Sequence, residues 1–70
     1  GIGSEAIRLA LRYAFDKLRC EQVYAEVLAS NEASQQMLRS IGFEHTATLP
    51  RWHWQDNHYE DLHYYQIWHP

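Results

Sequence analysis

The sequence predicts a single α/β domain whose elements follow the order helix, strand, helix, strand, strand. Apolar residues recur at helical spacing in residues 4 to about 18 and again in residues 32–41. An alternating segment, residues 23–29, lies between these two predicted helices. Two aromatic-rich runs then flank the turn signal Asp56-Asn57. We therefore expect a mixed sheet that ends in a C-terminal antiparallel hairpin.

The composition limits the class of protein. The chain has 70 residues, which is enough for at most one domain, and 46% of them are hydrophobic, which is typical of a folded chain. Cys20 is the only cysteine, so no disulfide can form within the chain, and this fits a reducing compartment. The net charge of −3 and the lack of a basic stripe argue against nucleic acid as a partner.

The chain has no apolar run near the ~20 residues that would span a bilayer. It also shows no signal peptide, so we expect a cytoplasmic protein without a membrane partner. The sequence lacks an initiator Met. We therefore expect residues 1–70 to form one partial domain, the C-terminal portion of a longer enzyme.

The first predicted helix begins at Ser4, which can act as the N-cap, and ends near Leu18. Ile7, Leu11 and Ala14 extend this apolar stripe at intervals of three and four residues. A helix start leaves backbone N–H groups without partners and carries a partial positive charge, so it can hold a phosphate. Because Gly1-Ile2-Gly3 precedes it, the backbone can approach such a group closely.

The predicted strand is followed by the cap signal Ser30-Asn31 and by a second helix from about Glu32 to Ile41. Its expected buried stripe consists of Ser34, Met37, Leu38 and Ile41. Gly42 stands where a left-handed residue ends a helix. Two helix starts separated by one strand indicate a phosphate-bearing cofactor across one edge of the sheet.

The last part of the chain is β-like and rich in aromatic residues. We expect one strand from Phe43 to Trp54, bent or interrupted at Pro50, and its antiparallel partner from Tyr59 to Trp68. The aromatic side chains favour a core with cross-strand pairs, a wall of a ligand site or a subunit interface. We expect a homodimer or association with the missing N-terminal half.

These features together resemble the C-terminal half of the GCN5-related N-acetyltransferase (GNAT) superfamily. Gly1-Ile2-Gly3 resembles the end of its pyrophosphate loop, and Asn31 followed by Gly42-Phe43 resembles its Asn…Gly-Phe segment. Asp61 resembles a common acidic position in the last strand. The Arg/Gln that usually opens the pyrophosphate loop is absent, as is the first half of the fold.

The segment that runs from Asn31 to Gly42-Phe43 is most similar to the ribosomal-protein N-terminal acetyltransferase subgroup. Leu38 stands where many family members carry Tyr, and the run Asn31-Glu32-Ala33-Ser34 resembles that subgroup. The resemblance implies that Ser34 is the acid that protonates the coenzyme A thiolate. With Leu38 in place of Tyr, the alternative acid is a water molecule.

The resemblance implies an N-acetyltransferase that moves acetyl from acetyl-CoA (coenzyme A) to a primary amine, either a protein N-terminus or a small amine. The expected cofactor-binding residues are Gly1, Ile2, Gly3, Ser4, Asn31 and Ser34. Asn31 would meet the pantetheine arm. The base stays open between Glu26 and Asp61, and we expect the 70-residue chain alone to be inactive or weakly active.

Structural explanations stand beside these functional ones. Asn31 can be a helix cap only, and Ser34 an ordinary polar helix residue. A catalytically inactive chain that folds and associates is an alternative function. A second alternative function is a His-rich metal-binding module, because His53, His58 and His63 recur every five residues. We nevertheless expect no metal, since residues five apart point to opposite faces of a strand.

Overall fold

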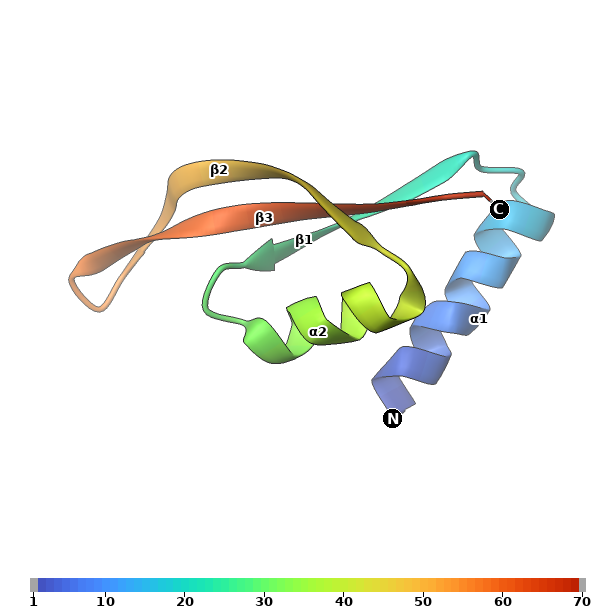
Figure 1. The fold of residues 1–70 in the computed structure, drawn as a ribbon, viewed down its shortest axis with the longest axis horizontal. Coiled ribbons are helices and arrows are strands. Elements are labelled where there is room, and N and C mark those ends of the chain that lie inside the picture. Colours follow the sequence, from blue (N-terminus) through green and yellow to red (C-terminus); the bar gives the residue numbers. More distant parts are fainter. Residues whose placement is uncertain (1, 70) are drawn as a thin grey trace.

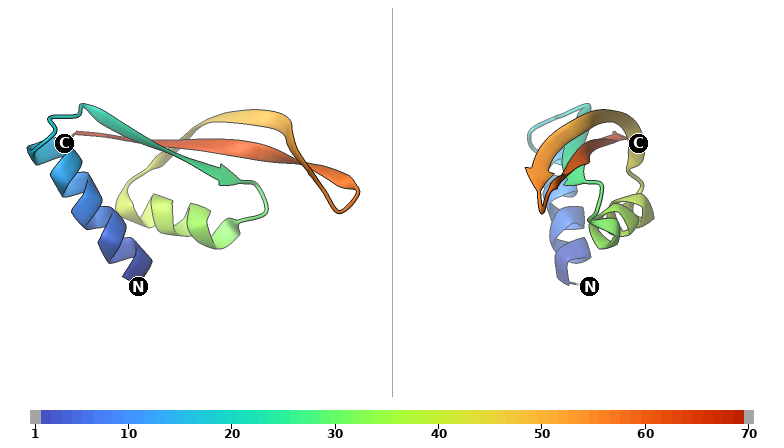
Figure 2. Two further views of the ribbon diagram at one scale, coloured as in Figure 1. Left: turned by 180° about the vertical axis from the view of Figure 1, so that it is seen from behind. Right: turned by 90° about the vertical axis from the view of Figure 1, so that its left-hand side faces the viewer.

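The predicted α/β class and element order are confirmed. The structure is a computed structural model that describes residues 2–69, without the side chain of Ile2. Two helices and three strands follow one another as α1 (Ile2–Asp16), β1 (Gln22–Leu28), α2 (Glu32–Ile41), β2 (Glu44–Gln55) and β3 (His58–Trp68). The elements form two layers, with both helices on one side of the sheet (Figures 1 and 2).

The sheet has the strand order β1-β3-β2, so the last strand lies in its centre. Both pairs are antiparallel in the described residues 2–69, where the sequence led us to expect a mixed sheet. The hairpin between β2 and β3 forms one pair, and β1 lies along the opposite edge of β3. Within residues 2–69, β1 pairs with β3 alone, so its outer edge is open.

One hydrophobic core lies between the sheet and the helices. Tyr65 at the centre of β3 is 0% exposed. The core around it is completed by Leu11, Val27, Leu38 and Phe43. In β1, Val27 is buried and its neighbours alternate between half-buried and exposed, as expected for a strand with one covered face.

The predicted bounds of the first helix are wrong at both ends. α1 begins at Ile2, so Gly3 and Ser4 lie inside its first turn and Ser4 is not the N-cap. The helix ends at Asp16 because the Cys20 N–H donates to the Ala14 carbonyl (3.0 Å) across a residue with positive φ, Arg19. Leu18 therefore leaves the apolar stripe and is 60% exposed.

The second helix has the predicted bounds. Asn31 is its N-cap, since the side-chain oxygen accepts a hydrogen bond from the Ser34 N–H. Gly42 ends it with φ 122°, and its N–H donates to the carbonyls of Leu38 and Arg39. The expected stripe is confirmed in part: Leu38 is buried and Ser34 is half-buried.

The hairpin turns at Asp56 and Asn57, whose φ angles of 50° and 64° confirm the predicted tight turn. β2 is irregular after Pro50, where the pairing shifts between Leu49 and His53 and Arg51 has φ 54°. All twelve residues of β2 are exposed. The hairpin tip extends past α2, so no helix lies beneath it (Figures 1 and 2).

Candidate functional site

The start of α2 is held by its cap. Asn31 Oδ1 accepts from the Ser34 backbone N–H at 3.2 Å. This contact uses the amide oxygen of Asn31 and leaves its amide nitrogen for another partner. Ser34 stands one turn inside the helix and is half-buried, and its hydroxyl makes no hydrogen bond within the described chain. Both predicted residues therefore keep polar atoms that a ligand can use.

The start of α1 lies against α2. A Cβ built at Gly3 would come within 3.6 Å of Met37 Sδ, and Met37 lies one turn after Ser34. Ser4 is half-buried, and Ile2 is the first residue of the helix. Gly1 lies outside the described residues. Gly3 and Ser4 belong to the first turn of α1 and not to a loop. Their binding of an anion through the N–H groups of a helix start stays a prediction.

An apolar cavity of about 310 Å³ separates α1 from β1. It is lined by Ile7, Ala10, Leu11, Ala14, Val23, Tyr24, Ala25, Leu38 and Phe43. Leu38 is 4% exposed, so the position where many relatives carry Tyr is filled here by a core side chain. The β1 residues that line the cavity belong to a strand whose outer edge is unpaired within residues 2–69.

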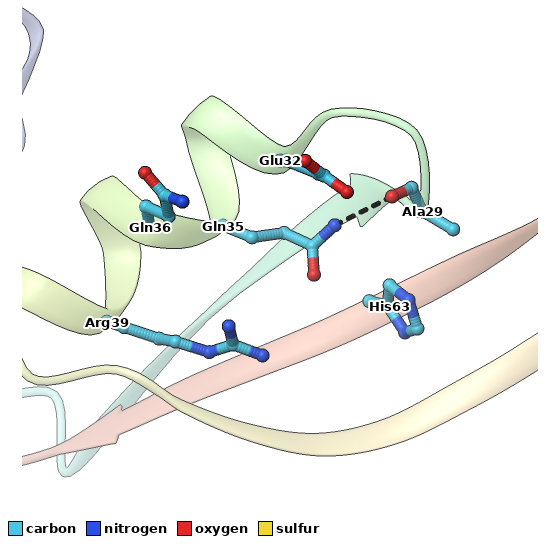
Figure 3. A pocket seen from close by; sticks show the side chains of 6 residues that line it. All are labelled: Ala29, Glu32, Gln35, Gln36, Arg39 and His63. Carbon is cyan, nitrogen blue, oxygen red and sulfur yellow. Dashed lines mark hydrogen bonds between the residues drawn. The ribbon is translucent and has the colours of Figure 1, made fainter.

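Gln35 fixes α2 to the sheet, and the sequence analysis did not single it out. Its Nε2 donates to the Ala29 carbonyl at 2.9 Å, and its Oε1 accepts from the Tyr65 hydroxyl at 2.8 Å. Gln35 is 8% exposed, so both bonds form away from water. Figure 3 shows the side chain reaching from the helix towards the end of β1. This contact sets the position of the Asn31 cap one turn earlier.

A polar pocket of about 340 Å³ surrounds Gln35 (Figure 3). Its lining consists of Ala29, Glu32, Gln35, Gln36, Arg39 and His63. The Arg39 guanidinium carbon lies 5.6 Å from the centre of the Tyr65 ring, which is a cation–π contact. His63 Nδ1 lies 2.9 Å from Thr48 Oγ1, which fixes its ring at the pocket wall.

The two carboxylates considered as bases have different surroundings. Asp61 Oδ1 accepts from the Arg51 N–H at 3.0 Å, so this carboxylate holds the irregular part of β2. Glu26 lies directly across from Tyr64 on the open face of the sheet. Desolvation and then the Glu26 carboxylate raise the pKa of Tyr64 above its ordinary value.

The histidines do not gather as the metal hypothesis requires. His45 and His63 meet, with Nε2 and Nδ1 3.0 Å apart. His53 contacts Gln55 and His58 contacts the Asp56 carbonyl, both near the hairpin tip. Among residues 2–69, no group of three or more His, Cys, Asp or Glu side chains converges as metal ligands.

The family described as "Acetyltransferase (GNAT) domain" matches residues 1–44, which is more than half of the chain. The chain belongs to the GNAT acetyltransferase family. Enzymes of this family use acetyl-CoA as the acetyl donor. The match spans both helix starts and ends just beyond Phe43, so it covers every residue of the candidate cofactor site. No curated protein matches the chain in a sequence comparison.

Solved structures of other acetyltransferases have the same fold. A probable acetyltransferase is 28% identical with a TM-score of 0.88, and covers 97% of this chain. A GNAT acetyltransferase from Bacillus anthracis is 25% identical with a TM-score of 0.86, again over 97% of this chain. A dodecameric spermidine N-acetyltransferase from Vibrio cholerae is 24% identical with a TM-score of 0.89 over the same share.

The chain spans 38%, 41% and 40% of the length of these three structures. It therefore corresponds to about two fifths of a solved acetyltransferase chain. Within the described residues 2–69, neither helix has the length and apolarity needed to cross a membrane.

Proposed function

We propose that residues 1–70 are the acetyl-CoA-binding C-terminal part of an N-acetyltransferase that acts on a primary amine. The observation that carries this proposal is that, in a GNAT chain, the first turn of α1 packs on α2, the helix whose start carries Asn31 and Ser34. The first turn of α1 lies against α2 at Met37, one turn beyond the half-buried Ser34. Positive helix ends so arranged suit the phosphates and the pantetheine arm of one extended cofactor.

The proposed roles follow from the polar atoms that remain available. Gly1, Ile2, Gly3 and Ser4 would offer backbone N–H groups to the pyrophosphate. The amide nitrogen of Asn31 would donate to the pantetheine arm, because its oxygen is already engaged by Ser34 N–H.

In the reaction, a neutral amine attacks the thioester carbonyl, and the tetrahedral intermediate collapses to an amide and a thiolate. The amine nitrogen then loses a proton to solvent water, and the thiolate sulfur takes one. Ser34 would give its hydroxyl proton to the sulfur and take another from solvent water, since this hydroxyl makes no hydrogen bond in the described chain. A thiol has a reference pKa near 8.5, so the thiolate leaves readily.

The acceptor is either a protein N-terminus or a small amine. The run Asn31-Glu32-Ala33-Ser34 supports the first, through its similarity to the ribosomal-protein subgroup. The fold shared with spermidine N-acetyltransferases supports the second. We favour the small amine, because the acidic open face of the sheet, described in the next subsection, suits a polycation.

The remaining part of the fold would cover the open edge of β1 and the apolar cavity next to it. Alone, the chain would be inactive or weakly active and would associate, either with that part or with a second copy. The exposed Trp52 and Trp54 on the hairpin, 60% and 57% exposed, support such an association. A cytoplasmic location fits the single Cys20.

Thermal melting with and without acetyl-CoA tests the proposal. A ligand at about 100 times its dissociation constant adds about 2.7 kcal/mol of stability. Asn31→Ser keeps a capping oxygen but removes the amide nitrogen, so it should reduce this rise without unfolding α2. Ser40→Ala is the matched control, because the Ser40 hydroxyl donates to the Met37 carbonyl on the same helix. No rise in the wild-type chain would contradict cofactor binding by these residues.

A further inference from the structure

The sheet face turned away from both helices carries a carboxylate beside two tyrosine rings. Val23, Ala25 and Val27 of β1 point to the helices, so the alternating Tyr24 and Glu26 point to the opposite face. Glu26 pairs directly with Tyr64 of β3. The rings of Tyr24 and Tyr64 have centroids 6.3 Å apart. One small ligand can therefore reach the carboxylate and both rings together.

This patch borders a hollow of about 460 Å³ on the same face. Its lining is Tyr24, Thr46, Ala47, Tyr64 and Gln66. Two tyrosines and Ala47 make most of this lining apolar, Thr46 and Gln66 add polar groups, and Glu26 lies outside the lining as the strand partner of Tyr64. Such a combination suits a molecule with an alkyl chain and a charged end.

The charge of this face favours a cation. Neither β1 nor β3 contains a Lys or Arg. Glu44 pairs with Gln66 across β2 and β3, so a second carboxylate lies on the same face. The Tyr64 hydroxyl is neutral at neutral pH, and desolvation and then Glu26 raise its pKa further above the ordinary value. An ammonium group placed here would meet attraction from the acid and from the negative ring faces.

We propose that Glu26, Tyr24 and Tyr64 bind the protonated ammonium group of an alkyl diamine or polyamine acceptor. The inference rests on the proposed acetyltransferase function. The amine that attacks the thioester must be neutral, whereas a second alkylamine, with a pKa near 10.4, keeps its proton at neutral pH. This site holds the charged nitrogen and leaves the other nitrogen of the same molecule free to react.

The test is an NMR titration of the full 70-residue chain with 1,4-diaminobutane, and 1,4-butanediol serves as the uncharged probe of equal length. Shifts should appear at Tyr24, Glu26 and Tyr64 with the diamine and not with the diol, and added salt should weaken them. Glu26→Gln and Tyr24→Leu should each weaken binding about three- to fivefold. Glu21→Gln, an exposed carboxylate outside the patch, should leave binding unchanged.

Several results would overturn the proposal: equal shifts with the diol, unchanged affinity in Glu26→Gln, or a dimer whose interface buries Tyr24. The last result would assign this face to a second copy of the chain. Failure of the proposed function gives a different pattern, namely no acetyl-CoA-induced rise in melting temperature while diamine binding persists. Glu26→Gln itself should keep the full acetyl-CoA-induced rise, which separates the acceptor site from the cofactor site.

Discussion

The contact between Tyr65 and Gln35 gives the sharpest prediction about stability. Tyr65→Phe removes the hydroxyl that donates to Gln35 Oε1 at 2.8 Å and keeps the ring in the core. Because Tyr65 is 0% exposed and Gln35 is 8% exposed, water cannot easily replace the lost donor. An unsatisfied buried acceptor costs about 1–3 kcal/mol. For a domain of this size, about 2 kcal/mol lowers the melting temperature by roughly 8–16 °C.

Urea unfolding followed by circular dichroism measures this loss, with Tyr59→Phe as the control. Tyr59 is 51% exposed, so its substitution should change the free energy of unfolding by less than about 0.5 kcal/mol. Gln35→Leu should also destabilise the chain, because it leaves the Tyr65 hydroxyl and the Ala29 carbonyl without their partner. The double variant Gln35→Leu/Tyr65→Phe should cost less than the sum of the two single variants, since the first change already removes their shared bond.

The reasoning is refuted if Tyr65→Phe is as stable as Tyr59→Phe, or if the two costs add without coupling. Either result would mean that the buried hydrogen bond does not hold α2 to the sheet. The position of the Asn31 cap would then have to depend on apolar packing alone.

Three further predictions concern the ends of elements. Asn31→Ala should lower the free energy of unfolding by about 0.5–2 kcal/mol, while Asn31→Ser should lose far less, as denaturant unfolding would reveal. Gly42→Ala should cost about 1 kcal/mol or more, because φ is 122°, a backbone conformation that residues with a Cβ rarely adopt; an unchanged melting temperature would contradict this. Hydrogen bonding to Ser30, first through the Ser30 side chain and then through its N–H, lowers the pKa of Glu60 below its ordinary value of 4.5. The stability that this group contributes is therefore present above that value and is lost as the pH falls through the lowered pKa. Acid titration of Glu60→Gln should lack this loss, and an acid profile identical to the wild type would exclude the contact.

The elements with clear local signals could be predicted from the sequence. The bounds of α2 follow from Asn31 and Gly42, whose side chain and backbone satisfy the helix ends. The tight turn follows from Asp56 and Asn57, since both residues tolerate positive φ. These features depend on a few neighbouring residues, and the fold does not override them.

Features that depend on distant contacts could not be predicted. Glycines at the chain start were interpreted as a loop, whereas Gly3 lies in α1 beside Met37 of another helix. Leu18 fitted the apolar stripe, but the turn at Arg19 ends the helix before it. Gln35 gives no apolar signal, and its burial depends on Tyr65, 30 residues away. The antiparallel pairing of β1 with β3 likewise depends on the order of all three strands in the sheet.

The site residues that could be predicted from the sequence are those that belong to a recognisable motif. Asn31 was found through its position at a helix start and Ser34 through the family resemblance, and the structure confirms the Asn31 cap. Their roles towards a cofactor stay predictions, as do those of Gly3 and Ser4. The patch around Glu26 required strand register, because only pairing brings it beside Tyr64.

The central claim is that the two helix starts of this chain together bind acetyl-CoA. Mapping of backbone amide shifts by NMR, as acetyl-CoA is added to the labelled chain, tests it most directly. The account predicts that the largest shifts fall on residues 3–5 and 31–34, because the N–H groups of residues 3–5 and the side chains of Asn31 and Ser34 would meet the cofactor. Shifts that are absent, or that fall on the hairpin of residues 51–60, would contradict it.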